Sequence, residues 1–318
     1  MNLLKQGVSI IVCCYNSEST IERTIDALIK QKTNFKYEIL LIDNLCTDNS
    51  IVIAKKKLSK SGCSYKILIE DTPGLTNARK RGVFNARYNI LVFCDDDNFL
   101  SENYIQIVFE EFSNNKTIGA IGGKGIAISS INLPEWFEKY RSSFACGPQG
   151  ENGDVTKSRG YLYGAALGVR TELIRNIFLS TKLVLSDRKG NKLLSGGDSE
   201  ITVKIALEGH KLFYFENLTF QHYLHNQRLN LKYLEKLHLS FGKSQIVLYP
   251  LIQKCTIGKE VKINFRYTLK LFCSEYRNIF SFLSKKKSFS GTIKGAFAWG
   301  IILGFIRQKV ILFTSNRV

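Results

Sequence analysis

Residues 89–98 of the 318-residue chain read NILVFCDDDN, a nearly continuous apolar run that ends in three adjacent aspartates. An apolar run without polar alternation is typical of a strand that is covered on both faces of a parallel sheet. In open sheets of this kind, ligands bind beyond the carboxyl ends of the strands. We therefore expect the functional residues to follow the strands directly, and Asp95, Asp96 and Asp97 to be among them.

The first half of the chain repeats this pattern, because short apolar runs alternate with longer stretches of helical periodicity. Strands are predicted at residues 8–14, 37–42, 65–69 and 118–122, and helices at residues 19–30, 48–61, 75–86 and 102–112. This alternation predicts an α/β fold with a mostly parallel central sheet flanked by helices. The second half is less regular, with predicted strands at 161–169 and 212–215 and predicted helices at 134–140, 199–207 and 229–241.

The three adjacent carboxylates repel one another, so they are tolerated only where solvent or a cation compensates their charge. At a strand end, such oxygen ligands suit Mg²⁺ or Mn²⁺, and the metal would neutralise a diphosphate. A solvated acidic loop, or an N-cap for the helix that follows, is the alternative interpretation of residues 95–97.

Polar residues also follow two other predicted strands. Tyr15 and Asn16 come after the first strand, where an aromatic ring can stack on a nucleobase or cover the core. Asp43 comes after the second strand, where its carboxylate can accept a hydrogen bond from a base N–H or cap a turn. Together with residues 95–97 these make three strand ends, and two of the three are acidic, although the net charge of the protein is +18.

Residues 195–200 read SGGDSE and precede a predicted helix. A carboxylate at a helix N-terminus, after two flexible glycines, suits a base that takes a proton from an attacking hydroxyl group. Asp198 has this position, but it could instead only cap the helix. Glu200 is a weaker candidate, for a contact with the acceptor.

The positive charge is concentrated near the C-terminus. From residue 251 onward, thirteen lysine and arginine residues are opposed only by Glu260 and Glu275. Nucleic acid, an anionic membrane surface and a phosphate-rich substrate are the partners that such charge suggests. Basic residues interleaved with apolar ones can lie on anionic lipid, or they can form a solvated helical face. The most apolar stretch, residues 295–306, is too short to span a bilayer, so only peripheral membrane contact is expected.

The cysteines and the N-terminus suggest a compartment. None of the 8 cysteines forms a CxxC pair, which argues against a zinc site. Several lie within apolar runs and are expected to be buried thiols in a reducing compartment. The N-terminus runs directly into the first predicted strand, so no signal peptide is expected. We expect a cytoplasmic protein with peripheral contact to the inner face of the cell membrane.

Four runs of the chain together resemble the family 2 glycosyltransferases of the GT-A fold. The runs are VSIIVCCYNSESTIERTIDAL, YEILLIDNLCTDNS, PGLTNARKRGV and ILVFCDDDNFL, and the resemblance extends over residues 7–245 in order and spacing. It implies a Rossmann-like GT-A catalytic domain at residues 1–245, which binds a UDP-, GDP- or dTDP-sugar. The remainder, residues 246–318, is then a basic and mostly helical C-terminal extension.

The resemblance also implies which residues bind the donor. Tyr15 matches the aromatic residue that stacks on the base, and Asn16 follows it in the same site. Asp43 matches the acid that reads the base, and Arg79 matches an arginine that contacts the donor. Arg228 is a further candidate, for contact with the leaving diphosphate. The chain departs from the family at the first motif, where the family often has proline or threonine in place of two cysteines.

The resemblance also implies which residues bind the metal and which residue acts as the catalytic base. Asp95 and Asp97 match the two ends of the DxD metal motif, and Asp96 lies near the ribose. His222 matches a histidine that faces the metal or the diphosphate, which makes it a candidate third ligand. Asp198 matches the catalytic base, although the family typically has a glutamate directly before it and this chain has a glycine.

These expectations describe an inverting transferase that moves a sugar to a hydroxyl group by direct displacement, in surface polysaccharide or glycolipid synthesis. The acceptor would be a glycan or a lipid-linked molecule. A nucleotidyltransferase is disfavoured, because residues 13–17 read CCYNS where such enzymes need a basic, glycine-rich loop. A nucleic-acid-binding protein is disfavoured too, because no helix-turn-helix or RNP-like pattern is present, and no nucleic-acid partner is expected. A non-catalytic homologue that only binds nucleotide sugars is the remaining alternative.

Overall fold

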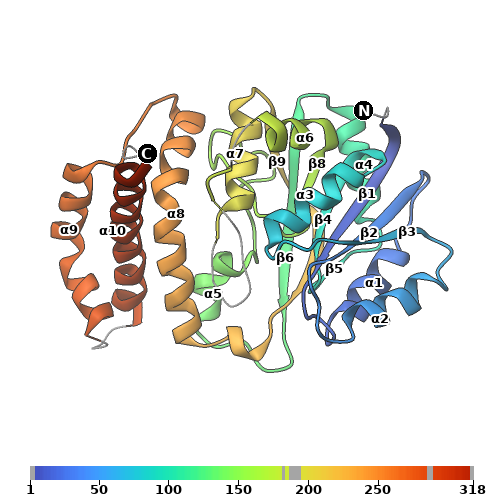
Figure 1. Cartoon of the computed structure of the whole chain (residues 1–318), viewed down its shortest axis with the longest axis horizontal. Helices are drawn as coiled ribbons and strands as arrows, with labels where there is room; N and C mark the ends of the chain where they lie inside the picture. The colour runs from blue at the N-terminus through green and yellow to red at the C-terminus, as the bar shows by residue number, and fades with distance from the viewer. Residues whose placement is uncertain (1–3, 181–182, 186–194, 285–288, 316–318) are drawn as a thin grey trace.

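The computed structural model of the protein describes residues 4–180, 183–185, 195–284 and 289–315 (Figure 1). Its strands are β1 (Lys5–Cys14), β2 (Tyr37–Asp43), β3 (Ser64–Ile69), β4 (Tyr88–Asp95), β5 (Asn98–Leu100), β6 (Ile118–Ile128), β7 (Gly153–Asp154), β8 (Gly168–Arg170) and β9 (Lys211–Tyr223). Its α-helices are α1 (Ile21–Ile29), α2 (Ser50–Leu58), α3 (Leu75–Asn85), α4 (Tyr104–Asn114), α5 (Phe137–Tyr140), α6 (Thr171–Ser180), α7 (Gly197–Leu207), α8 (Leu231–Ile257), α9 (Phe265–Leu283) and α10 (Phe289–Ser315). Two 3₁₀-helices, η1 (Arg141–Phe144) and η2 (Asn226–Arg228), complete the regular structure of the described residues.

One sheet with strand order β3-β2-β1-β4-β8-β6-β9-β5 forms the centre of the molecule, and β7 pairs with β9. The long pairings, of β1 with β2 and β4, of β2 with β3 and of β6 with β9, are parallel. The short strands β5, β7 and β8 pair antiparallel with their neighbours. The predicted α/β fold with flanking helices is confirmed, and the sheet is mixed because these short strands join its C-terminal half.

Alternating side chains of β1 show which helices cover which face of the sheet. Val8, Ile10 and Val12 point into a core that they share with α1, α2 and α4. Ile11 points into a second core, which it shares with α3, α6 and α7. All four side chains are fully buried, as expected for a strand covered on both faces. This layered core fixes the positions of the strand ends, where the candidate site lies.

The second half differs from the prediction in the extent of its elements. Only β8 (Gly168–Arg170) pairs within the expected strand at 161–169. Ala166, just before it, has a left-handed backbone with φ of 54°, and its carbonyl oxygen accepts a hydrogen bond from the Tyr104 hydroxyl group (2.5 Å). Strand β9 and helix α8 are longer than predicted, because tertiary packing continues each of them past the end of its sequence pattern.

Helices α8, α9 and α10 form a layer at one end of the molecule, with α10 between the other two (Figure 1). The predicted domain boundary at 245/246 falls inside the continuous helix α8. Glycines permit the close packing: a Cβ atom at Gly300 of α10 would lie 2.3 Å from the carbonyl oxygen of Leu239, and one at Gly295 would meet the backbone of α9. The apolar stretch at 295–306 thus contributes to a protein core, with Ala296 fully buried and Ile301 4% exposed.

Among the helices within the described residues, none combines the length and the apolar character that a bilayer crossing requires.

Candidate active site

The strand ends that follow β1, β2 and β4 lie side by side at one edge of the sheet. In the parallel ladder Cys14 pairs with Asp43, and Cys13 pairs with Asp95. The residues predicted from three separate motifs therefore come together at the carboxyl edge, where α/β proteins bind ligands.

The Asp95 carboxylate lies at the end of β4, 3.6 Å from the guanidinium group of Arg79 on α3. The Arg79 side chain is 4% exposed and lies over the Phe93 ring, with 5.4 Å from its guanidinium carbon to the ring centroid. Burial against an aromatic ring fixes the arginine in one orientation, towards the carboxylates. The structure thus brings together Arg79 and Asp95, which come from two separate motifs.

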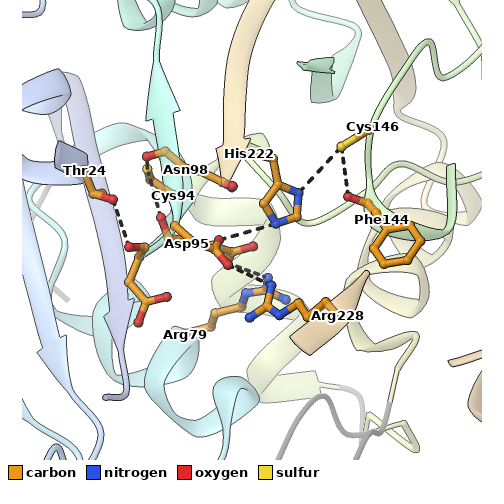
Figure 2. A network of polar contacts seen from close by, with 11 residues as sticks. Thr24, Arg79, Cys94, Asp95, Asn98, Phe144, Cys146, His222 and Arg228 are labelled. Carbon is orange, nitrogen blue, oxygen red and sulfur yellow. Dashed lines mark hydrogen bonds and ion pairs between the residues drawn. The ribbon is translucent and has the colours of Figure 1, made fainter. Parts of the chain in front are cut away.

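Asp97 is buried in a polar network that joins three distant parts of the chain (Figure 2). Its Oδ2 atom accepts a hydrogen bond from Arg228 Nη1 (2.9 Å), and its Oδ1 atom lies 3.5 Å from Nε2 of His222. Nδ1 of the same histidine lies 4.0 Å from the Cys146 sulfur. Burial lowers the pKa of His222, but the Asp97 carboxylate outweighs burial and raises it to about 10. Arg228 and His222 therefore both stabilise the charge of Asp97.

Asp96 points away from this network, towards the end of β1. Its Oδ2 atom accepts a hydrogen bond from the backbone N–H of Tyr15 (3.0 Å), and its carbonyl oxygen accepts one from the Thr24 hydroxyl group (2.9 Å). Burial and the neighbouring Asp97 raise the pKa of Asp96 to about 7. The three adjacent carboxylates thus have separate partners, which explains how the protein tolerates them together.

The residues predicted to bind a base line the other side of this edge. Tyr15 is 51% exposed, so its ring does not serve to cover the core. Asn16 has a left-handed φ of 51°, and its side-chain oxygen accepts a hydrogen bond from the backbone N–H of Thr47 (2.8 Å). Asp43 is half-buried and accepts one from the backbone N–H of Cys46 (2.9 Å) at its Oδ1 atom. An exposed tyrosine and a carboxylate that accepts a backbone hydrogen bond thus lie at the ends of the neighbouring strands β1 and β2.

Asp198 lies in the first turn of α7, where the helix dipole favours a carboxylate. Its Oδ2 atom accepts a hydrogen bond from the backbone N–H of Gly164 (2.5 Å), and its Oδ1 atom accepts one from Ser199 N–H (2.7 Å). A Cβ atom at Gly164 would lie 2.6 Å from Arg79 Nη2 and 2.7 Å from Asp198 Cβ. Arg79, which contacts Asp95, and Asp198 therefore meet around one glycine, although they come from opposite halves of the chain.

Glu200 is fully buried and has a structural position. Its carboxylate accepts hydrogen bonds from the backbone N–H groups of Val184 (3.0 Å) and Leu185 (2.7 Å). Lys204, one turn later on α7, lies 2.8 Å from the same carboxylate. The Glu200 carboxylate thus holds residues 184–185 and Lys204 in place, and its contact with the acceptor stays a prediction.

Two supporting contacts were missed from the sequence. The Ser244 hydroxyl group of α8 donates a hydrogen bond to the carbonyl oxygen of Ser195 (2.6 Å), and the Ser240 and Ser195 hydroxyl groups lie 3.0 Å apart. Helix α8 thereby holds the segment that leads into Asp198. Cys146, which contacts His222, was also missed. Two serines four residues apart on one face of α8 were the indication in the sequence, but no local pattern identifies the residue that they contact.

A divalent metal fits this site only with help from the substrate. In the described part of the chain, no three acidic, histidine or cysteine side chains form a cluster that could hold a metal ion, so Asp95, Asp97 and His222 are not a complete cage. Mg²⁺ and Mn²⁺ sites on nucleotides commonly use one or two carboxylates and complete their shell with phosphate oxygens and water. Asp95 and Asp97, both at the end of β4, fit that pattern.

The mixed sheet with its flanking helices has the fold of GT-A glycosyltransferases, as comparisons with known structures show. S. aureus TarS (residues 1–349) in complex with UDP-GlcNAc superposes with a TM-score of 0.53 at 14% identity, over 95% of this chain and 92% of the other. The mannosyltransferase PcManGT from Pyrobaculum calidifontis, solved with GDP-Man and Mn²⁺, superposes with a TM-score of 0.57 at 14% identity, over 93% and 86%. At these identities the likeness shows the fold.

The family follows from the sequence comparison: residues 9–178 match the model of glycosyl transferase family 2, and the chain belongs to this family. It is 35% identical over 109 residues to the uncharacterized glycosyltransferase EpsJ of Bacillus subtilis (strain 168), and 25% identical over 118 residues to the poly-beta-1,6-N-acetyl-D-glucosamine synthase of Staphylococcus aureus (strain COL). These alignments cover 34% and 37% of this chain but only 31% and 28% of the relatives. The family match ends before Asp198 and His222, so the roles of these two residues depend on their geometry.

Proposed function

We propose that this glycosyltransferase inverts the anomeric configuration as it passes a sugar from a nucleotide-diphosphate sugar to an acceptor hydroxyl group. The observation that carries the proposal is the meeting of Arg79 and Asp198 around Gly164, which puts a candidate base next to the candidate donor site. In direct displacement, the bond from the acceptor oxygen to the anomeric carbon forms while the bond to the diphosphate breaks. Inversion follows because attack comes from the face opposite the leaving group.

Each residue has a defined task in this scheme. Tyr15 stacks on the base, with Asn16 beside it, and Asp43 accepts a hydrogen bond from a base N–H. Arg79 contacts the donor. Asp198 takes the proton of the acceptor hydroxyl group, and the N–H of Gly164 holds its carboxylate in place.

The diphosphate of the donor would lie at the end of β4, beside Asp95 and Asp97. Asp95 and Asp97 would hold Mn²⁺ or Mg²⁺, with His222 beside Asp97, and Asp96 lies near the ribose. When bound, the metal supplies positive charge that stabilises the leaving diphosphate. Arg228, which is paired with Asp97, can donate to the same phosphate oxygens.

The biological setting is part of the proposal. Relatives whose names refer to polysaccharide synthesis support a glycan or lipid-linked acceptor in surface polysaccharide or glycolipid synthesis. All eight cysteines are free thiols, which supports a reducing compartment such as the cytoplasm.

Calorimetry with UDP-GlcNAc and GDP-mannose, in Mn²⁺ or in chelator, combined with donor hydrolysis, tests the function. We expect one donor to bind only with metal. Asp97→Asn should weaken this binding, because it removes a metal ligand.

Asp198→Asn should bind the donor within threefold of the wild type but lose turnover by about 10²–10⁴-fold, the usual share of general base catalysis. Glu208→Gln, at the exposed end of the same helix, is the matched control.

Three outcomes would contradict the proposal. If the folded protein bound neither donor, the nucleotide-sugar site would be wrong for both tested donors. If Asp198→Asn lost donor binding, its role as base would be wrong. If the wild type bound a donor without turnover, and Asp198→Asn changed nothing, the chain would be the non-catalytic homologue.

A further inference from the structure

Helix α9 lies at the outer edge of the molecule, on the side of α10 that faces away from α8 (Figure 1). One of its faces is apolar and exposed to solvent. Six side chains make up this face, here named the α9 stripe, and each is between 44% and 68% exposed: Phe265, Leu269, Phe272, Tyr276, Phe280 and Leu283. They follow one another at intervals of three or four residues, so they form a single row along the helix.

A row of basic residues runs beside the α9 stripe. Arg266, Lys270 and Arg277 each follow a stripe residue by one position, and all three are exposed. One position on a helix is about 100°, so the three cations lie along the same flank. The acid of this helix, Glu275, precedes the stripe residue Tyr276 by one position, so it lies on the opposite side of the α9 stripe from the basic flank. It is half-buried and accepts a hydrogen bond from Asn278 (2.6 Å). The opposite face of α9, with Thr268 and Ile279, is buried.

We propose that the α9 stripe lies in the interface of an anionic lipid membrane, with the basic flank on the lipid phosphates. An exposed apolar row next to lysine and arginine is the pattern of helices that lie in the plane of a membrane surface. Monomeric soluble proteins rarely leave so continuous an apolar face in water. The lipid supplies both an apolar interior and negative charge, so it complements both rows at once.

A second copy of the chain complements this surface less well. A symmetric dimer through the α9 stripe would bring the basic flanks of both copies to the same interface, where like charges repel. The sequence suggested residues 295–306 for membrane contact, but this stretch of α10 packs between α8 and α9, with Ala296 and Ile301 buried. The exposed apolar surface that could contact lipid therefore lies on the neighbouring helix, α9.

Flotation of the full chain with lipid vesicles tests the proposal. We expect at least tenfold tighter binding to vesicles of equal parts phosphatidylglycerol and phosphatidylcholine than to phosphatidylcholine alone, weakened by 500 mM salt. The double variant Phe272→Ser/Phe280→Ser should bind at least tenfold more weakly. The triple variant Arg266→Gln/Lys270→Gln/Arg277→Gln should lose the preference for phosphatidylglycerol.

Matched controls lie on α2 and in the turn directly after it, at the other end of the molecule from α9 (Figure 1). Val52→Ser removes a side chain that is 67% exposed, and Lys55→Gln/Lys56→Gln/Lys60→Gln removes three exposed charges, so both should bind vesicles as the wild type does. The proposal is overturned if the wild type does not bind the anionic vesicles, or if the α9 and α2 variants behave alike. A wild-type dimer in sedimentation velocity that the double variant makes monomeric, without vesicle binding, would assign the surface to a second copy instead. Vesicle binding needs neither donor nor acceptor, so its outcome is independent of the proposed function.

Discussion

Gly164 shows how much of the site depends on the absence of one side chain. Its N–H donates to the Asp198 carboxylate, and the space where a Cβ atom would lie is bordered by Arg79 and Asp198. Its importance comes from the two residues on either side, which are 119 positions apart, since 198 minus 79 is 119.

Gly164→Ala is therefore expected to reduce catalysis more than stability. The new methyl group would lie within 3 Å of both side chains, so Arg79 or Asp198 must move. A displacement of about 1 Å at a reacting group can cost about 10²-fold in rate. Donor hydrolysis should fall about 10–10²-fold, while circular dichroism and the thermal midpoint show a folded protein. A variant with the wild-type rate would contradict the importance of this close approach.

At the scale of elements, α8 joins the catalytic half to the C-terminal layer. Its serines hold the segment before α7, and its other face packs against α10 through glycines. The continuous helix thus contacts both layers, and the predicted boundary at 245/246 lies within it.

Gly300→Ala tests this packing. The added Cβ atom would lie 2.3 Å from the backbone oxygen of Leu239 and 3.0 Å from the Cα atom of Gly242, and backbone atoms cannot rotate away. Overpacking of this kind costs about 2 kcal/mol, so the free energy of unfolding in urea should fall by about that amount. Ile306→Ala, at a side chain that is 51% exposed on the same helix, should change it by less than about 0.5 kcal/mol. Equal effects of the two substitutions would contradict the close approach of α8 and α10.

At the scale of the whole molecule, a partly buried histidine couples stability to pH. His238 of α8 lies 3.1 Å from the Ser143 hydroxyl group of η1, with Tyr140 and Phe241 against its ring. Burial lowers the pKa of His238 to about 4. The folded state thus holds this imidazole neutral, whereas the unfolded chain protonates it near its ordinary pKa of 6.5.

The stability from this histidine is complete above pH 6.5 and is lost as the pH falls towards 4. The loss is on the order of 2 kcal/mol, because each unit of pKa difference corresponds to about 1.4 kcal/mol and part of the ring is exposed. The free energy of unfolding should therefore fall more steeply between pH 7 and pH 4 in the wild type than in His238→Gln. Parallel pH profiles of the two proteins would show that the histidine is solvated.

The sequence by itself determined the fold class and the edge of the sheet that carries the site. Strand periodicity and the polar residues after each strand are local, so they predicted Tyr15, Asp43 and Asp95 at neighbouring strand ends, and the register of β1, β2 and β4 confirmed that placement. Only the tertiary structure decided which cations compensate Asp97, because Arg228 is 131 residues away along the chain. It also decided that Ala296 and Ile301 of α10 are buried, whereas the α9 stripe is exposed. Both helices have apolar residues, and burial depends on which neighbour packs against them, which no local pattern encodes.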